Sequence, residues 1–186
     1  MSVVSKDNPC NLESPARGFT LIELMVSIMV ATIVALYGVP AMKQMIDANR
    51  LTARTNQLVH SLFLARSEAV KRNQPVSVCA SGVKGDDDTG IWKDGWSVKH
   101  GKDCLDIQPI ESIGPGDSGT STTTSINRVT FYGDGTTDSP PDTAFVLVNA
   151  RYTPDVNLRR VVELTVGGAV HSCKPGADNN DCEAKD

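Results

Sequence analysis

A single carboxylate, Glu23, stands near the start of a long apolar stretch, and its position is the first feature that suggests chemistry. From Leu24 to Met42 the chain has nineteen residues without a formal charge, which is long enough to cross a bilayer as a helix. An ionisable group at the edge of such a segment is costly to bury and usually serves a function. The sequence therefore predicts that Glu23 pairs with a positive group when this segment is packed.

The side chains that often serve in catalysis do not form a recognisable motif. The three histidines, His60, His100 and His171, are far apart in sequence and have no nucleophile motif beside them. Neither a P-loop nor a dinucleotide-binding fingerprint occurs. We therefore predict a protein that is not an enzyme and that has no catalytic residues and no cofactor.

Metal binding has little support in the sequence. The acidic turn at 85–90 and the aspartates Asp134, Asp138 and Asp142 do not have the ligand spacing of an EF-hand, and acidic turns are usually just solvated. Zinc would require clustered ligands, but the chain has no C-x-x-C pair and its histidines are dispersed. The prediction is that no metal site is present.

The cysteines indicate an oxidising compartment. Cys10 precedes the apolar stretch, whereas Cys79, Cys104, Cys173 and Cys182 follow it. Four cysteines in a domain outside the cytoplasm predict two disulfides, with three possible connectivities. We favour the pairs Cys79–Cys104 and Cys173–Cys182, because each closes a local loop.

The distribution of charge predicts an orientation in the membrane. The chain has 186 residues and a net charge of -4, which argues against a dedicated nucleic-acid binder. Lys6 and Arg17 precede the apolar stretch and the bulk of the chain follows it, so we expect the N-terminus inside and the domain outside. A removable secretory signal is the alternative, but its apolar region usually has about 7–15 residues and a small-residue cleavage site.

Residues 17–24, "RGFTLIEL", resemble the processing site of type IV pilins and type II secretion pseudopilins. The resemblance implies that a prepilin peptidase cuts between Gly18 and Phe19, removes 1–18 as a leader and leaves Phe19 N-methylated. Glu23 would then be the fifth residue of the mature chain, and the new amine of a neighbouring subunit would be its partner. Pairing relieves the desolvation cost of both charges and fixes the register of the packed helices.

A second stretch, residues 64–79, resembles the helix-to-strand junction of minor pilins in the FimU, FimT and GspH group. This resemblance implies a non-enzymatic minor pilin of the type IV pilus assembly or priming complex, anchored in the bacterial inner membrane with its C-terminal domain in the periplasm. Its partners would be other minor and major pilins, the prepilin peptidase, the inner-membrane assembly platform and membrane lipid. A minor pseudopilin of a type II secretion system is the alternative.

DNA binding for natural transformation is a second alternative, because some FimT-like pilins bind DNA through a Gly-Arg-x-Arg motif in the C-terminal hairpin. If the match starts at Gly168, Ala169 and His171 occupy the arginine positions, so two permanent cations are missing. Other cations could contact phosphates or lie on solvated strand faces: Arg151, Arg159, Arg160 and Lys174. The sequence thus argues against DNA as a partner.

The apolar periodicity predicts one long helix over 19–74, with a transmembrane part at about 19–42. Gly38 and Pro40 mark a predicted kink, and Pro75 ends the helix. A buried stripe is predicted at Leu51, Leu58, Leu62, Ala65 and Ala69. The other side of the helix is expected to carry Arg50, Arg54, Gln57, Arg66 and Lys71.

The residues after Pro75 read as β structure. Segments rich in apolar and β-branched residues are predicted as strands at 76–80, 96–99, 128–132, 144–150 and 159–166. Gly167 and Gly168 indicate a two-residue hairpin turn before 169–173, whereas 112–125 is predicted as a loop. The predicted fold class is α+β, with the long helix packed on a small antiparallel β domain at 75–186. The family resemblance implies the same pilin-like fold.

Overall fold

The computed structural model describes residues 18–83, 90–105, 108–116, 120–141, 143–149 and 158–175. The chain divides after Met42 into two compact units, which are described separately below. One helix, α1 (Leu21–Arg72), supplies residues to both units. Several sequence predictions concern residues outside the described ranges: the leader up to Arg17, the turn at 85–90 except Gly90, Asp142, Arg151 and Cys182.

The ends of α1 have clear local causes. Thr20 is the N-cap, because its hydroxyl oxygen accepts a hydrogen bond from the Glu23 backbone N–H at 3.2 Å. After Arg72 the backbone of Asn73 takes a φ of 50°, a left-handed conformation that commonly ends helices, and Pro75 follows. The helix is thus two residues shorter at each end than the sequence predicted.

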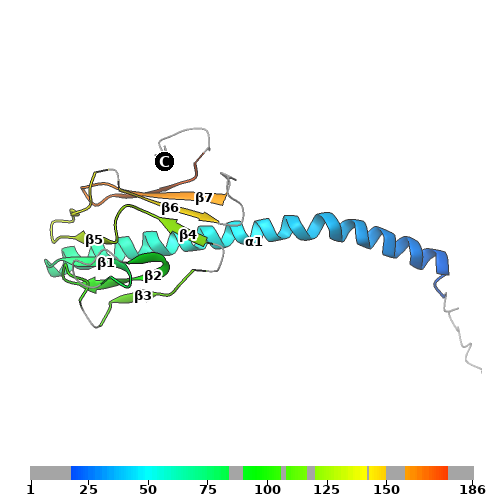
Figure 1. Cartoon of the computed structure of the whole chain (residues 1–186), viewed down its shortest axis with the longest axis horizontal. Helices are drawn as coiled ribbons and strands as arrows, with labels where there is room; N and C mark the ends of the chain where they lie inside the picture. Colours follow the sequence, from blue (N-terminus) through cyan, green and yellow to red (C-terminus); the bar gives the residue numbers. More distant parts are fainter. Residues whose placement is uncertain are drawn as a thin grey trace, which may run out of the picture. The chain divides into compact units, whose positions relative to one another are not determined.

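The described residues after α1 form two four-stranded antiparallel sheets. The first has the order β3-β2-β1-β5 and the second the order β4-β6-β7-β8 (Figure 1). The strands are β1 (Val76–Ser81), β2 (Ile91–His100), β3 (Glu111–Ile113), β4 (Thr120–Thr123), β5 (Arg128–Phe131), β6 (Thr143–Asn149), β7 (Arg159–Leu164) and β8 (Val170–Cys173).

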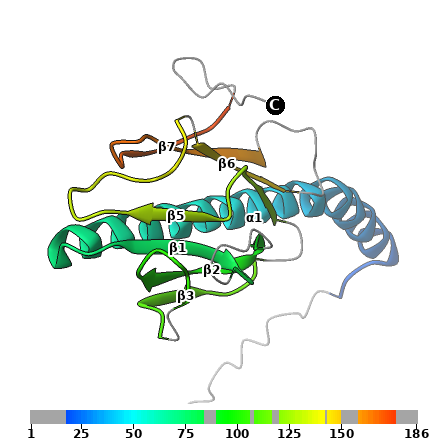
Figure 2. The same ribbon diagram turned by 60° about the vertical axis from the view of Figure 1, so that its left-hand side comes forward.

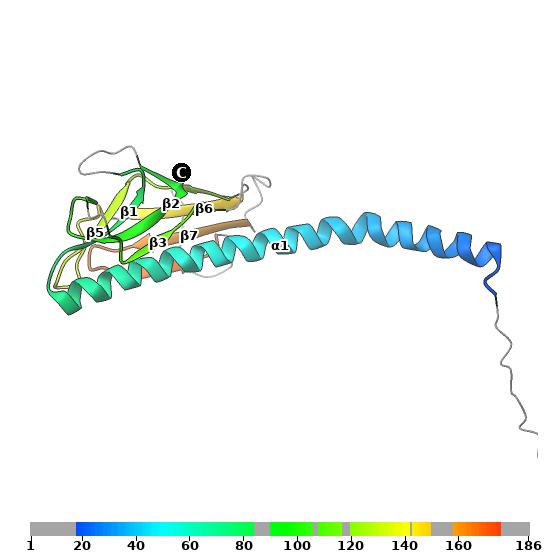
Figure 3. The same ribbon diagram turned by 90° about the horizontal axis from the view of Figure 1, so that it is seen from below.

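The second unit has its core between the α1 residues after Lys43 and the two sheets. Figures 2 and 3 show both sheets lying along this part of α1. The predicted stripe is confirmed, since all five of its residues are fully buried. Large side chains from both sheets join them in one cluster, namely Trp96 of β2, Phe131 of β5 and Phe145 of β6. Burial of apolar area, at about 25 cal/mol per Å², thus holds the helix to both sheets.

The prediction that Arg54 lies on the polar side of the helix is wrong. Its side chain belongs to the buried side and is 8% exposed. Arg54 follows Leu51 by three residues and precedes Leu58 by four, and residues at these spacings share one helix face. Its guanidinium carbon lies 4.1 Å from the centre of the Trp96 ring, so a cation–π contact offsets part of the burial cost.

The predicted loop at 112–125 is also wrong, because it contains most of β3 and all of β4. Both are edge strands, β3 pairing with β2 and β4 pairing with β6. An edge strand has one neighbour and can keep polar side chains, so its sequence need not alternate. Residues of β3 and β4 therefore form strands because their backbone pairs with β2 and β6, and not because of a pattern in their own side chains.

The favoured disulfide between Cys79 of β1 and Cys104 is confirmed, with a distance of 6.0 Å between the Cα atoms. Both residues are buried. Because Cys182 lies outside the described residues, the Cys173–Cys182 pair stays a prediction.

Replacing Cys79 and Cys104 together with alanine is expected to lower the free energy of unfolding by about 3 kcal/mol. The disulfide closes a sequence separation of 25 residues, which restricts the unfolded chain. Urea unfolding of the full-length chain in detergent, followed by near-UV circular dichroism, would measure the difference. Unchanged stability of the double variant would contradict the expected contribution of this crosslink.

Candidate assembly site

The described residues of the first unit, 18–42, present an exposed apolar surface. Every residue from Gly18 to Met42 is exposed, including bulky ones such as Phe19 and Tyr37, which are each 78% exposed. By length and composition, α1 can cross a membrane. Contiguous apolar surface of this kind is unfavourable in water, so it requires a cover of lipid or other apolar helices.

Glu23 lies in the first turn of α1, and its carboxylate has no hydrogen bond or ion pair within the described part of the chain. Its backbone N–H, in contrast, is satisfied by the hydroxyl of Thr20. The sequence T-x-x-E at 20–23 matches a capping box, in which a glutamate at the third helical position favours the helix start. Glu23 therefore has a local explanation besides the predicted pairing with an amine.

The predicted cleavage point lies just before the helix. Gly18 and Phe19 precede the first helical residue, Leu21, so the bond between them is outside the helical hydrogen-bond ladder. A Cβ added at Gly18 would meet no atom within 4 Å. Cleavage here and methylation of Phe19 stay predictions, as does the kink at Gly38 and Pro40, through which α1 continues.

The hairpin between β7 and β8 is built differently from the predicted two-residue turn. Thr165 N–H donates to the Ala169 carbonyl at 3.0 Å, and Gly168 N–H donates to the Thr165 carbonyl at 2.8 Å. The loop therefore has three residues, Val166, Gly167 and Gly168. Three-residue hairpin loops place their last residue in the left-handed region, and Gly168 has a φ of +73°.

Gly168 is also held against neighbouring segments. A Cβ at this position would lie 2.2 Å from the Gly135 carbonyl oxygen, in the turn after β5. Arg66 of α1 reaches the same place and donates from Nη2 to the Gly167 carbonyl at 3.2 Å. The hairpin tip is thus fixed both to the helix and to the β5 turn.

Replacing Gly168 with alanine is expected to destabilise the second unit by about 2–4 kcal/mol, because the new Cβ forces both backbone strain and a clash with Gly135. Gly167→Ala is the matched control, since its Cβ would meet only Thr165 Oγ1 at 3.9 Å. Thermal unfolding of both variants would test this. Equal melting temperatures for the two variants would contradict the assigned contact.

The same geometry bears on the DNA alternative. Packing against Gly135 accounts for Gly168 without a nucleic-acid contact. His171 is exposed and Ala169 is half-buried. Of the other cations, Arg160 donates from Nη2 to Thr52 Oγ1 of α1 at 3.4 Å, so this side chain also makes a contact within the protein. That DNA is not a partner stays a prediction.

Two of the aspartates considered for calcium stabilise turns. Asp134 Oδ1 accepts hydrogen bonds from the Thr136 N–H at 3.0 Å and from its hydroxyl at 2.7 Å, and these bonds lower the pKa of Asp134. Asp138 Oδ1 accepts from the Thr130 N–H at 2.9 Å. The absence of a metal site remains a prediction.

A polar network that the sequence did not reveal crosses from α1 to both β2 and β3. Trp96 Nε1 donates to Ser61 Oγ at 3.0 Å, and Ser61 Oγ donates to Glu111 Oε2 at 2.7 Å. His60 Nδ1 lies 3.6 Å from Glu111 Oε1. The serine is fully buried and bonded to the carboxylate rather than to the imidazole, which is unlike the arrangement of a hydrolase triad. Only the fold brings these residues together, because 50 positions separate Ser61 from Glu111.

Comparisons with known proteins assign the chain to a family. The family described as type II transport protein GspH matches residues 54–168, and the prokaryotic N-terminal methylation motif matches residues 14–38. The chain belongs to the GspH family. A search of curated protein sequences gave no match.

Solved structures show a related fold. The type IV minor pilin FimU of Pseudomonas aeruginosa aligns with this GspH-family protein with a TM-score of 0.55 and 21% identity, covering 66% of this chain and 87% of that chain. The minor pseudopilin EpsH from the Type 2 Secretion System of Vibrio cholerae aligns with a TM-score of 0.47 and 13% identity, covering 69% and 99%. The FimU alignment confirms the predicted pilin-like fold.

Membership of the GspH family and the methylation motif together define the class of the protein. It is a minor pilin or pseudopilin of a type IV pilus or a type II secretion system. The methylation motif spans Gly18, Phe19 and Glu23, and the GspH match spans the end of α1 from Arg54 and the two sheets as far as Gly168.

Proposed function

We propose that this GspH-family protein is a non-enzymatic minor pilin of the type IV pilus assembly complex. The observation that carries the proposal is the exposed apolar surface from Phe19 to Met42, which carries the carboxylate of Glu23 near its start. In the membrane, lipid covers this surface. In a filament, the helices of other subunits cover it. The same helix thus anchors the subunit in the membrane before assembly and packs against other subunits after it.

The steps of assembly follow from the charges. The prepilin peptidase cuts after Gly18 and leaves a methylated amine on Phe19, while the second unit stays in the periplasm. As helices pack, Glu23 pairs with the amine of a neighbouring subunit. An unpaired charge in an apolar environment is costly, so only the register that joins the two charges is stable.

A non-enzymatic function agrees with the buried polar network. Ser61 is fully buried, and its hydroxyl is engaged with Trp96 and Glu111. The network joins the α1 helix to the edge strand β3, and it therefore serves packing. A network that stabilises packing is expected in a subunit that acts by binding other subunits.

A type II secretion pseudopilin is the second candidate, because the matching family is described as a type II transport protein. Both machines require the same helix packing, so the N-terminal segment does not separate them. Gene neighbours and the secreted proteins of a deletion strain would distinguish the two machines.

The decisive experiment counts surface pili by electron microscopy on cells that lack the gene and on complemented cells. Loss of pili that complementation restores would support the proposed function. Normal pili together with defective enzyme secretion would overturn it in favour of the pseudopilin.

A further inference from the structure

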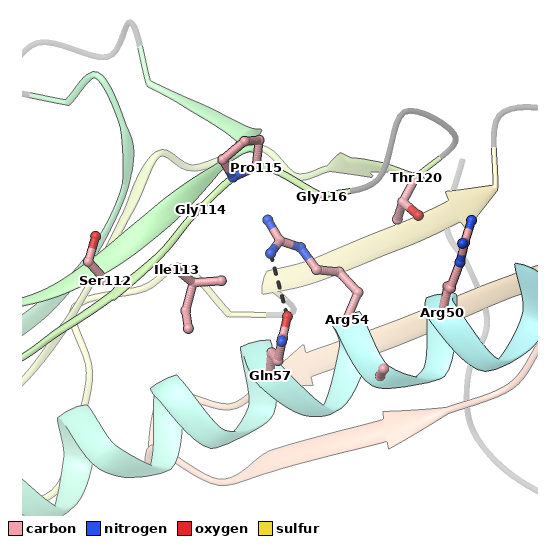
Figure 4. Close-up of a pocket in the computed structure, with 10 residues that line it drawn as sticks. Arg50, Arg54, Gln57, Ser112, Ile113, Gly114, Pro115, Gly116 and Thr120 are labelled. Carbon is pink, nitrogen blue, oxygen red and sulfur yellow. Dashed lines mark hydrogen bonds between the residues drawn. The ribbon is translucent and has the colours of Figure 1, made fainter.

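A polar pocket of about 410 Å³ lies between α1 and the segment that follows β3. Arg50, Arg54 and Gln57 line it from the helix, 114–116 line it from the segment after β3, and Thr120 of β4 also lines it. Figure 4 shows the Arg54 guanidinium and the Gln57 amide pointing toward Gly114 and Gly116. The described residues that line the pocket include two arginines, Arg50 and Arg54, and no acidic side chain.

The Arg54 guanidinium is held in one orientation. The Trp96 ring covers one of its faces, 4.1 Å from the guanidinium carbon. On another side Gly116 lies so close that an added Cβ would be 3.4 Å from Arg54 Nε. A planar donor fixed in this way loses little entropy when it binds a planar acceptor.

The hydrogen bonds of Arg54 are incomplete within the described part of the chain. Nη1 donates to Gln57 Oε1 at 3.5 Å, which is the outer limit of a hydrogen bond, and Nη2 is buried without a partner. A buried donor without an acceptor costs about 1–3 kcal/mol. Burial also lowers the pKa of Arg54, as expected for a desolvated cation.

We propose that this pocket binds a carboxylate side chain, aspartate or glutamate, of another pilin subunit. The carboxylate accepts from Arg54 Nη1 in place of Gln57 and from the buried Nη2, and Arg50 also lines the pocket. The protein source of the carboxylate rests on the proposed function, whereas the chemistry of the pocket does not.

The test uses the full-length chain in detergent micelles, labelled with ¹⁵N at its two tryptophans. The probes are the blocked peptides acetyl-Ala-Glu-Ala-amide and acetyl-Ala-Gln-Ala-amide, at constant ionic strength. The glutamate peptide should shift the Trp96 indole resonance saturably, and the glutamine peptide should bind about tenfold more weakly. Equal shifts by the two peptides, or tighter binding of inorganic phosphate, would overturn the proposal.

Two variants identify the group responsible. Arg54→Met keeps much of the side-chain packing but removes the charge, so it should abolish the shift. Lys43→Met removes one charge from the same helix outside the pocket and should leave binding unchanged. If Arg54→Met fails to fold, Arg54→Lys replaces it and should weaken binding about tenfold, because lysine lacks the planar fork. Unaltered binding in the folded Arg54 variant would refute the assignment.

Pilus counts separate the chemistry of the pocket from its source. In cells where deletion of the gene removes pili, the Arg54 variant should also lose most pili at an unchanged protein level. Normal pili in that variant would refute a partner subunit as the source. A deletion strain with normal pili would instead refute the proposed function, and the peptide titration does not depend on that result.

Discussion

Replacing Glu23 with glutamine is expected to reduce incorporation into filaments by at least about tenfold while leaving insertion into the membrane unchanged. Glutamine still suits the third position of a capping box, so the helix start at Thr20 is preserved. The substitution removes only the charge that would pair with the amine of Phe19. An amine packed among apolar helices without its counterion makes that packing unfavourable.

Immunoblots of sheared filaments and of membrane fractions would measure incorporation and insertion separately. Thr20→Ala is the matched control, because it removes the cap and retains the charge. The pairing hypothesis requires the glutamine variant to be far more defective than the Thr20 variant. If the order is reversed, Glu23 acts through the start of the helix.

Replacing Trp96 with alanine is expected to destabilise the second unit by about 3–5 kcal/mol. The Trp96 ring is fully buried and packs within the core cluster. Its loss leaves a cavity, removes the hydrogen bond to Ser61 and deprives the Arg54 guanidinium of the ring against which it lies. A buried cation and a cavity would then be uncompensated at the same place.

Two control variants distinguish these contributions in urea unfolding of the full-length chain. Trp96→Phe keeps an aromatic ring and loses the N–H donor, so it should cost only about 1–2 kcal/mol. Ile91→Ala changes a residue of the same strand that is 52% exposed, and it should have little effect. A loss below about 1 kcal/mol for Trp96→Ala would show that the core does not depend on this ring.

The sequence predicted those parts of the fold that repeat a local pattern. The buried stripe from Leu51 to Ala69 follows helical spacing, and the central strands β1, β6 and β7 carry enough apolar side chains to be recognised. The edge strands β3 and β4 were missed, because their polar residues become strands only through pairing with β2 and β6. Arg54 has the spacing of the buried face, but its charge favours a solvated position, and only the fold supplies the Trp96 ring that offsets its burial.

What the sequence determined by itself is the N-terminal methylation motif and the apolar segment that follows it. The processing motif, the carboxylate of Glu23 and the uncharged stretch to Met42 are contiguous, so their chemistry depends on neighbours in the chain. Only the tertiary structure decided the second unit's polar contacts: Ser61 with Glu111, Arg66 with Gly167, and Arg54 with Trp96. Their partners are distant in sequence, and burial of the apolar core is what brings them within hydrogen-bond or cation–π distance.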